Sequence, residues 1–220
     1  MLYIRRLFVV FSSVLVMDSR LRHPFTAIVA GPTSSGKTHF TLKLIRQCKT
    51  LITPSPDRIV YCYGIYQNIF DNYPDVEFHD GLPELSMFDG EKKTLLILDD
   101  LMMNTDDRVT SLFTRISHHK NVSVLYLTQN LFYKNKQSRT LSLNSHYIVL
   151  FKNIRDQTQI GVLARQMFPS KSAFMMEAFV DATSSDYGYL LVDLKPDIEE
   201  KFRLRTGIFE GETQFVYVRK

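Results

Sequence analysis

The octapeptide GPTSSGKT, residues 31–38, decides the fold of this 220-residue chain. It fits the pattern GxxxxGK[ST], in which two glycines let the backbone curl so that its N–H groups point inward. The apolar run before it, residues 25–30, is typical of a short strand, and residues 39–48 have the apolar spacing of a helix. This strand–loop–helix context predicts a Walker A phosphate loop at the positive end of a helix.

The residue types of the loop suit the phosphates of a nucleotide. We expect Lys37 to reach the β- and γ-phosphates, where it also serves catalysis, and the hydroxyl of Thr38 to join the ligands of Mg²⁺. ATP and Mg²⁺ are therefore the predicted cofactors. The predicted nucleotide-binding residues are Gly31, Pro32, Thr33, Ser34, Ser35, Gly36, Lys37 and Thr38.

A second element, LLILDD at residues 95–100, is an apolar strand that ends in two acids. This Walker B-like pattern predicts Asp99 as the carboxylate on the metal side of the site, as in phosphate-loop NTPases. Asp100 is predicted to polarise the attacking water, although its side chain is shorter than the glutamate common in that role. The alternative for either acid is an N-terminal cap of the next helix.

The order of the strands along the chain points to a third polar group. One strand, residues 58–63, lies between the phosphate-loop strand and the acid strand in sequence. This order is typical of the additional-strand ATPases, whose next strand carries a polar sensor at its tip. Here that strand is residues 122–128, so we predict that the Gln129 amide holds the attacking water or contacts the γ-phosphate. A strand-end glutamine that faces solvent is the alternative.

Apolar strands that alternate with helices favour an α/β fold with a mainly parallel central sheet flanked by helices. The tail adds a C-terminal β-hairpin, closed near residues 210–213. The two cysteines, Cys48 and Cys62, have no CxxC spacing, so we interpret them as reduced, buried residues.

The N-terminus requires a separate interpretation. Arg5 and Arg6 precede an apolar run, residues 7–16, that is too short to span a bilayer and lacks a small-x-small cleavage site. We expect no stable membrane insertion, and Met17 is a candidate initiator. The predicted ATPase domain is residues 19–220, and residues 1–18 form an apolar extension that need not belong to the native fold.

Basic residues are concentrated in the second half of the chain. Residues 1–110 carry 12 basic and 13 acidic side chains, whereas residues 111–220 carry 15 and 10. Nine of the basic residues lie between positions 115 and 171, where the single acid is Asp156. Such a block indicates a polyanion such as nucleic acid, with a solvated basic face as the alternative.

Some of these arginines are candidates for an arginine finger. A finger acting on a neighbouring subunit would require a ring or at least a dimer. The candidates are Arg139, Arg155 and Arg115, with Arg165 a further one. The adjacent His118 and His119 do not suit a metal site, because neighbouring side chains point in different directions and no Cys or acid lies at ligand spacing.

Five segments together resemble a known family. GPTSSGKT, LLILDDLM (residues 95–102), LFTRISHHKNVSVLYLTQNLF (112–132), SLNSHYIVLFKNIRDQTQIGVLARQMFP (142–169) and DATSSDYGYLLVDLKP (181–196) are similar to the FtsK–HerA-type DNA-packaging ATPases of viruses and large DNA transposons. The likeness is strongest to poxvirus A32-like proteins and to the packaging ATPases of adenovirus-related Polinton/Maverick elements and adintoviruses. It covers residues 19–220.

The resemblance implies a P-loop NTPase of the RecA/FtsK-like type that forms a ring and pumps double-stranded DNA into a viral capsid. It assigns Lys37 and Thr38 to the phosphate loop, Asp99 and Asp100 to the Walker B acids, and Gln129 to the sensor. Implied partners are double-stranded DNA, further copies of the chain, and capsid or portal proteins. The implied location is the host nucleus, a viral factory or the virion.

Two other functions remain open. A P-loop nucleotide kinase has a similar loop, but it needs an arginine-rich lid and usually lacks paired acids at a strand end. A non-motor DNA-binding protein that uses ATP as an assembly switch would bind ATP tightly without DNA-stimulated hydrolysis.

Overall fold

The phosphate loop lies between strand β3 (Thr26–Ala30) and helix α1 (Lys37–Arg46), as predicted. A computed structural model describes residues 4–8, 18–99, 101, 107–132 and 136–220 of the chain. Asp100, predicted to be the general base, lies outside these described residues, as does the basic residue Lys134.

Ten strands form one sheet in the order β1-β12-β11-β10-β9-β3-β8-β7-β5-β6. The strands from β9 to β6 in that order are all parallel: β3, β5 (Arg58–Tyr63), β6 (Glu77–Asp80), β7 (Thr94–Asp99), β8 (Val122–Thr128) and β9 (Tyr147–Phe151). A second, two-stranded sheet pairs β2 (Leu21–Arg22) with β4 (Ile52–Thr53). The predicted α/β fold with a mainly parallel central sheet is confirmed.

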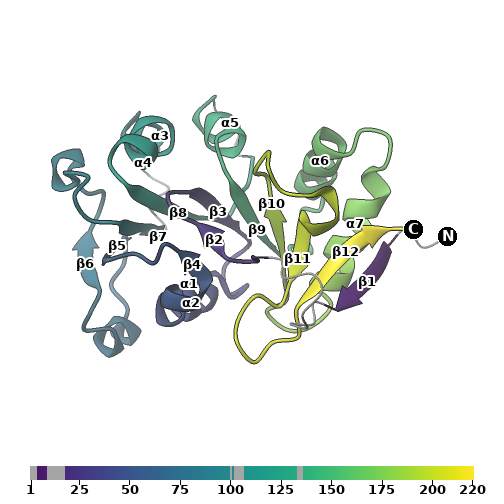
Figure 1. Ribbon diagram of the computed structural model, residues 1–220, viewed down its shortest axis with the longest axis horizontal. Coiled ribbons are helices and arrows are strands. Elements are labelled where there is room, and N and C mark those ends of the chain that lie inside the picture. Colours follow the sequence, from purple (N-terminus) through teal and green to yellow (C-terminus); the bar gives the residue numbers. More distant parts are fainter. Residues whose placement is uncertain (1–3, 9–17, 100, 102–106, 133–135) are drawn as a thin grey trace.

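The remaining strands extend this sheet in antiparallel fashion. They are β10 (Tyr189–Asp193), β11 (Leu204–Thr206), β12 (Phe215–Arg219) and β1 (Ile4–Phe8). Strands β11 and β12 form the predicted C-terminal hairpin, joined by residues 207–214. Strand β1 pairs with β12 at the edge of the sheet, near both ends of the chain (Figure 1). The interpretation of residues 1–18 as an extension, and of Met17 as initiator, stays a prediction.

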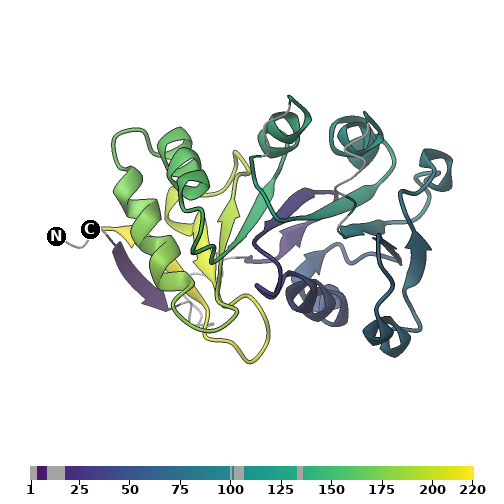
Figure 2. The ribbon, with the colours of Figure 1, turned by 180° about the vertical axis from the view of Figure 1, so that it is seen from behind.

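Helices cover both faces of the sheet (Figure 1). Helices α1 and α2 (Cys48–Leu51) lie on one face. The other face carries α3 (Asp107–Ser111), the π-helix Leu112–Ile116, α4 (Ser117–His119), α5 (Lys136–Leu143), α6 (Thr158–Met167) and α7 (Ser172–Ala182). Figure 2 shows α6 and α7 from behind, over the antiparallel part of the sheet. Short 3₁₀ turns lie at Asn68–Asn72, Leu85–Met87 and Glu200–Phe202. Helix α5 was not predicted, because Lys136–Leu143 has few apolar residues.

Two hydrophobic cores explain why the parallel strands are continuously apolar. Along β7, Leu96 and Leu98 pack into the core beneath α3, α5 and α6, whereas Leu95 and Ile97 pack into the core beneath α1. Alternate residues of a strand point to opposite faces, so a strand with helices on both sides needs apolar residues throughout. Both free cysteines are buried in these cores, as predicted.

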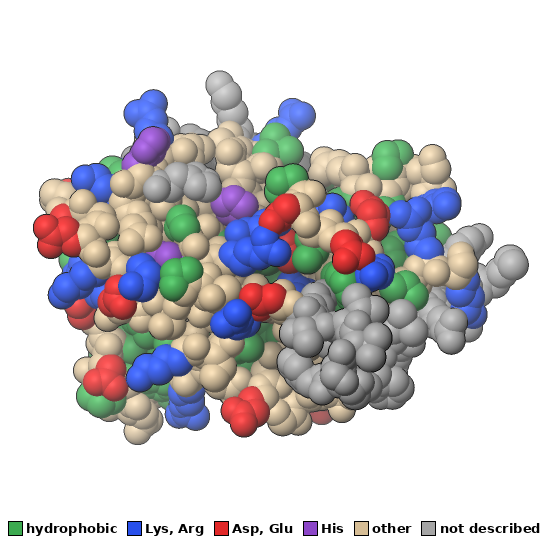
Figure 3. Space-filling view, in the orientation of Figure 1, with side chains coloured by type: hydrophobic (Ala, Val, Ile, Leu, Met, Phe, Trp, Pro, Cys, Tyr) green, Lys and Arg blue, Asp and Glu red, His purple; other side chains and the backbone are tan. Residues whose placement is uncertain are grey.

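Outside the segment 115–171, many basic side chains are paired with acidic ones. On the face seen in Figure 3, basic and acidic side chains lie side by side. Ion pairs of the described residues include Arg58–Glu77 and Lys43–Glu212 (each 2.6 Å). The segment 115–171 differs. Within the described parts of the chain, seven of its basic residues form no ion pair: Arg115, Lys120, Arg139, Lys152, Arg155, Arg165 and Lys171.

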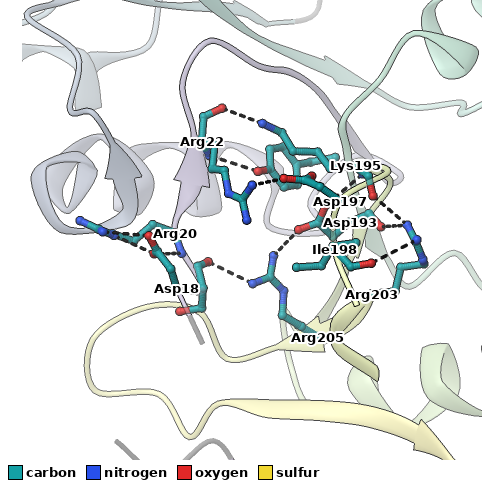
Figure 4. A network of polar contacts seen from close by, with 11 residues as sticks. Asp18, Arg20, Arg22, Asp193, Lys195, Asp197, Ile198, Arg203 and Arg205 are labelled. Atoms are coloured by element: carbon teal, nitrogen blue, oxygen red, sulfur yellow. Dashed lines mark hydrogen bonds and ion pairs between the residues drawn. The ribbon is translucent and has the colours of Figure 1, made fainter. Parts of the chain in front are cut away.

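A buried ion pair joins two strands of the antiparallel extension, and one of its members also bonds the chain before β2 (Figure 4). Arg205 on β11 donates to Asp193 on β10 at 2.9 Å and to the carbonyl of Ser19 at 3.1 Å. Arg205 is 1% exposed and Asp193 is 4% exposed. Burial raises the pKa of Asp193 and lowers the pKa of Arg205, so each charge depends on the other. The nearby pair of Arg22 with Asp197 lies at the surface.

Two of the ion pairs drawn in Figure 4, Arg205–Asp193 and Arg22–Asp197, give a matched test of what the buried pair contributes. Asp193→Ala should lower the free energy of unfolding by about 3–5 kcal/mol, because it leaves a buried guanidinium without its counter-charge. Asp197→Ala should have a far smaller effect, since water solvates the exposed Arg22. Urea unfolding followed by circular dichroism measures both. Equal losses in the two variants would contradict the assignment.

Candidate active site

A cavity of about 230 Å³ lies at the carboxyl edge of β3, β8 and β7. Parallel strands place their carboxyl ends at one edge of a sheet, which is where α/β folds build their sites. The cavity gathers side chains from the phosphate loop, β7 and the end of β8: Thr33, Ser34, Lys37, Thr38, Asp99, Thr128 and Gln129. Three groups predicted from separate stretches of sequence therefore line one space.

Both of these loop positions need glycine. Gly31 is in close contact with neighbouring side chains, and Gly36 has a backbone conformation that other residues rarely adopt. A Cβ on Gly31 would lie 2.6 Å from the Cβ of Phe151 on β9 and 2.6 Å from Ser35 Oγ. Gly36 adopts a φ of 105°, which side chains rarely allow, at the N-terminal cap of α1. These positions let the loop fold tightly over the start of α1.

Polar groups within the loop are suited to an anion. The ammonium of Lys37 donates to the carbonyls of Gly31 and Pro32, at 2.7 and 2.8 Å, and so lies across the mouth of the loop. The Oγ of Ser35 is buried and has no hydrogen-bond partner among the described residues. A buried hydroxyl without a partner costs stability. A phosphate oxygen in the loop would accept its hydrogen bond, so these residues fit nucleotide phosphates.

Asp99 is held by a residue that the sequence did not single out. The phenol of Tyr61 on β5 donates to Asp99 Oδ2 at 2.6 Å, and Tyr61 is completely buried. Burial, and then the charge of Asp99, raise the pKa of Tyr61 far above its usual value, so the phenol stays protonated and donates. In register, Tyr61 pairs with Ile97, two residues before Asp99 on the same face of the sheet. Tyr61 therefore orients the carboxylate.

The cavity also suits a divalent cation. Thr38 and Asp99 line it together and supply a hydroxyl and a carboxylate, the oxygen ligands that Mg²⁺ prefers. Asp99 is 7% exposed, so its charge acts in a largely water-free surrounding. The choice of Thr38 and Asp99 as the metal-side residues stays a prediction.

Gln129 lies at the rim of the cavity, as expected for a residue at the tip of β8. Strand β8 lies between β3 and β7, and its carboxyl end lies beside both. The predicted position of Gln129 beside the Asp99 strand is confirmed. The Gln129 side chain is exposed and lines the cavity with Thr128.

The segment after Gln129 is fastened to α6 by another residue that sequence reasoning missed. Gln159 Oε1 accepts from the backbone N–H groups of Leu131 and Phe132, at 2.7 and 3.2 Å. Its Nε2 donates to Asp156 Oδ2 at 2.6 Å and to Asn130 Oδ1 at 3.3 Å. Gln159 thus joins the end of β8 to the loop between β9 and α6. Gln159 lies within the segment 142–169 that carries the family resemblance, but no pattern in that segment marks this amide as a supporting residue.

The arginine-finger candidates do not line the cavity of their own chain. Arg115, Arg139 and Arg155 are all exposed. Arg155 follows β9, which is parallel to β3, so its carboxyl end lies at the same edge of the sheet as the cavity. Arg115 lies just before α4, which leads to the amino end of β8 and so to the opposite edge.

Residues 118–120, which include the two adjacent histidines, lie at the edge of the sheet opposite to the cavity. The carbonyl of Asn121, directly after Lys120, accepts from Thr94 N at the first residue of β7, while Asp99 is the last. The prediction that residues 118–120 lie at the opposite edge of the sheet from Gln129 is confirmed. The side chain of His119 is exposed.

Comparison with known proteins identifies the fold. No protein-family model and no curated protein matches the chain. The chain is similar to the genome packaging NTPase B204 from Sulfolobus turreted icosahedral virus 2 in complex with ATP-gammaS, with a TM-score of 0.50 and 12% identity over 81% of this chain and 94% of that chain. The complex of B204 with sulfate has a TM-score of 0.46 and 14% identity, over 80% and 98% of the two chains.

A KaiC-like protein from Pyrococcus horikoshii OT3 has a TM-score of 0.44 and 13% identity, over 89% and 91% of the two chains. The fold is the α/β fold of a P-loop NTPase, with a mostly parallel central sheet. No helix within the described residues is long and apolar enough to cross a membrane.

Tyr61→Phe should weaken metal use without preventing nucleotide binding. Loss of the phenol removes the hydrogen bond that orients Asp99, and such supporting bonds are worth about 10–100-fold in metal affinity or activity. The Mg²⁺ concentration for half-maximal ATP hydrolysis should therefore rise about tenfold or more. Tyr73→Phe, a change at another buried tyrosine of the same core, is the control and should leave it unchanged. Identical Mg²⁺ curves for wild type and Tyr61→Phe would remove this role.

Proposed function

We propose that the chain is an ATPase that translocates double-stranded DNA into a viral capsid. The observation that carries the proposal is the single cavity lined by the phosphate loop, Asp99 and Gln129. A kinase has no need of a polar sensor between the loop strand and the acid strand. Hydrolysis coupled to movement does need one, because the presence of the γ-phosphate has to be transmitted to the rest of the molecule.

Each group has a role in this proposal. The loop amides and Lys37 hold the phosphates of ATP, and Thr38 and Asp99 would hold Mg²⁺. A bound Mg²⁺ would neutralise charge on the phosphate oxygens. Asp100, next to Asp99 in sequence, accepts a proton from the attacking water. Gln129 positions that water or contacts the γ-phosphate. When the γ-phosphate leaves after hydrolysis, the change at Gln129 is transmitted to α6 through the segment that Gln159 holds.

The DNA-binding part of the proposal rests on charge. Seven basic residues of the segment 115–171 have no acidic partner within the described chain, whereas most basic residues elsewhere are paired. Cations without internal partners are available to DNA phosphates, in contacts that are independent of sequence and weakened by salt. The fold that the chain shares with a genome packaging NTPase supports the same assignment.

The position of the arginines supports assembly of several copies of the chain. Because none of the three candidates lines the cavity of its own chain, a finger would come from a neighbouring copy, as in a ring. We favour Arg155, which follows β9 and so lies at the same edge of the sheet as the cavity. Capsid or portal proteins are the further partners, and the host nucleus, a viral factory or the virion is the proposed location.

The first test is hydrolysis itself. Wild-type protein should hydrolyse ATP faster with duplex DNA than without it, and the stimulation should fall as salt is raised. Lys37→Ala should lower turnover at least about a hundredfold, because it removes a charge that stabilises the transferred phosphate. A coupled phosphate-release assay over a salt series, with particle mass measured by light scattering in the same samples, provides both readouts.

Asp100→Asn separates the two acids in the same assay. It should keep ATP binding, since Asp99 remains, and stop turnover. Normal hydrolysis by Asp100→Asn would show that Asp100 is not the general base. Tight ATP binding by wild type with no DNA-stimulated turnover would favour an ATP-dependent assembly switch. Phosphate transfer to a nucleoside monophosphate would favour a kinase.

A second test isolates the sensor. Gln129→Ala should bind ATP about as tightly as wild type, because the amide lies at the rim of the cavity, yet DNA should no longer accelerate its turnover. Gln166→Ala, a change to an exposed glutamine on α6, is the control. If DNA stimulates Gln129→Ala as strongly as wild type, Gln129 has no sensor role.

A further inference from the structure

Tyr187 combines two features that the fold alone does not explain. Its backbone φ is 56°, in the left-handed region that bulky residues avoid. Its side chain is nevertheless 67% exposed, so the ring gains little from burial in return. Strained conformations of this kind persist where the surrounding structure imposes them, and they gather at functional sites.

The ring of Tyr187 lies against the phosphate loop. A Cβ built on Gly36 would be 3.0 Å from Tyr187 Cδ1, so the ring contacts the loop at the start of α1. The exposed His39 follows on α1, with its ring centroid 6.4 Å from that of Tyr187 and 31° between the two planes. A flat group between two rings needs about 7 Å, twice the contact distance between carbon atoms. A small increase in the separation of the Tyr187 and His39 rings would let a flat group fit between them.

A second cavity, of about 420 Å³, lies beside Tyr187. It is lined by Ser34 and Ser35 of the loop, by Lys152 after β9, and by residues 184–188. Ser34 also lines the cavity that contains Asp99 and Gln129. The two cavities therefore meet at the phosphate loop. A row of phosphates bound in the loop would have Asp99 and Gln129 near one end and the ring of Tyr187 near the other.

The turn that carries Tyr187 is fixed before any ligand binds. The N–H of Gly188 donates to the carbonyl of Ser185 at 3.1 Å, and Ser184 Oγ donates to the carbonyl of Asp181 at 2.8 Å. A Cβ on Gly188 would lie 2.5 Å from the carbonyl oxygen of Ala182, so only glycine fits. The turn is thus closed between α7 and β10. A ring held in place in advance binds a flat partner at a lower entropic cost.

We infer that Tyr187 is the platform on which the base of a bound nucleoside triphosphate stacks, with His39 flanking that base. This inference rests on the proposed function, because the nucleotide has to bind in the phosphate loop. Tyr187 is a residue for holding the base and takes no part in the chemistry at the γ-phosphate.

The surroundings of Tyr187 also define how selective this site is. The polar side chains of the turn, Ser184, Ser185 and Asp186, are all exposed. Strong discrimination between similar ligands needs buried polar groups that the wrong ligand leaves unpaired. Stacking accepts every base, because each has a flat aromatic face. ATP and GTP should therefore bind with affinities within about tenfold of each other.

The experiment separates binding of the base from binding of the phosphates. Calorimetry on the full chain with Mg²⁺ compares ATPγS with inorganic tripolyphosphate, which has no base. Tyr187→Ala should weaken ATPγS binding about tenfold or more, as expected for loss of one stacking contact, and leave tripolyphosphate binding unchanged. Tyr187→Phe keeps the ring and should bind both ligands as wild type does. Tyr66→Ala, at another exposed tyrosine, is the control.

The outcomes distinguish this inference from the proposed function. Equal weakening of both ligands in Tyr187→Ala would mean that the ring only supports the loop, and unchanged ATPγS binding would place the base elsewhere. A preference of more than about a hundredfold between ATP and GTP would show recognition of base edges, against stacking. Each of these results overturns the inference alone. Wild-type protein that binds neither ligand overturns the proposed function as well.

Discussion

A backbone hydrogen bond, from the N–H of Gly31 to the carbonyl of Thr128 at 3.1 Å, ties the phosphate loop to the end of β8. It forms because β3 and β8 are parallel neighbours in which Ala30 lies opposite Thr128. On its other side β8 is in register with β7, with Leu127 opposite Asp99. The three strands therefore end at one level. The loop, the acid and the amide share a cavity because strand pairing brings their ends together.

Two residues outside the cavity hold the groups that line it in position. Tyr61 holds Asp99 from the neighbouring strand, and Gln159 holds the segment beyond Gln129 from helix α6. Neither residue lines the cavity. Such contacts fix the direction of a side chain that would otherwise rotate, and sites depend on that precision as much as on the reacting groups themselves. They also connect the cavity to β5 on one side and to the β9–α6 loop on the other.

Much of this arrangement was predictable because it follows from local patterns. Strands β5 and β8 have the predicted limits, and the tips of β7 and β8 carry the expected acid and amide. Other features depend on partners distant in sequence. Tyr61 is indistinguishable from a core residue until its register with β7 is known. The pairing of β1 with β12 joins the two ends of the chain, which no periodicity indicates. Tyr187 becomes noticeable only through its φ and its contact with Gly36.

The sheet ends, beyond β5, on the short strand β6. Its four residues include Glu77 and Asp80, both exposed, and Glu77 is paired with Arg58 of the adjacent strand. Short, charged edge strands discourage another sheet from adding to them, because joining would bury those charges. This margin is thereby protected against uncontrolled strand addition and aggregation. Any contact made at this edge would therefore form through side chains and loops rather than through strand pairing.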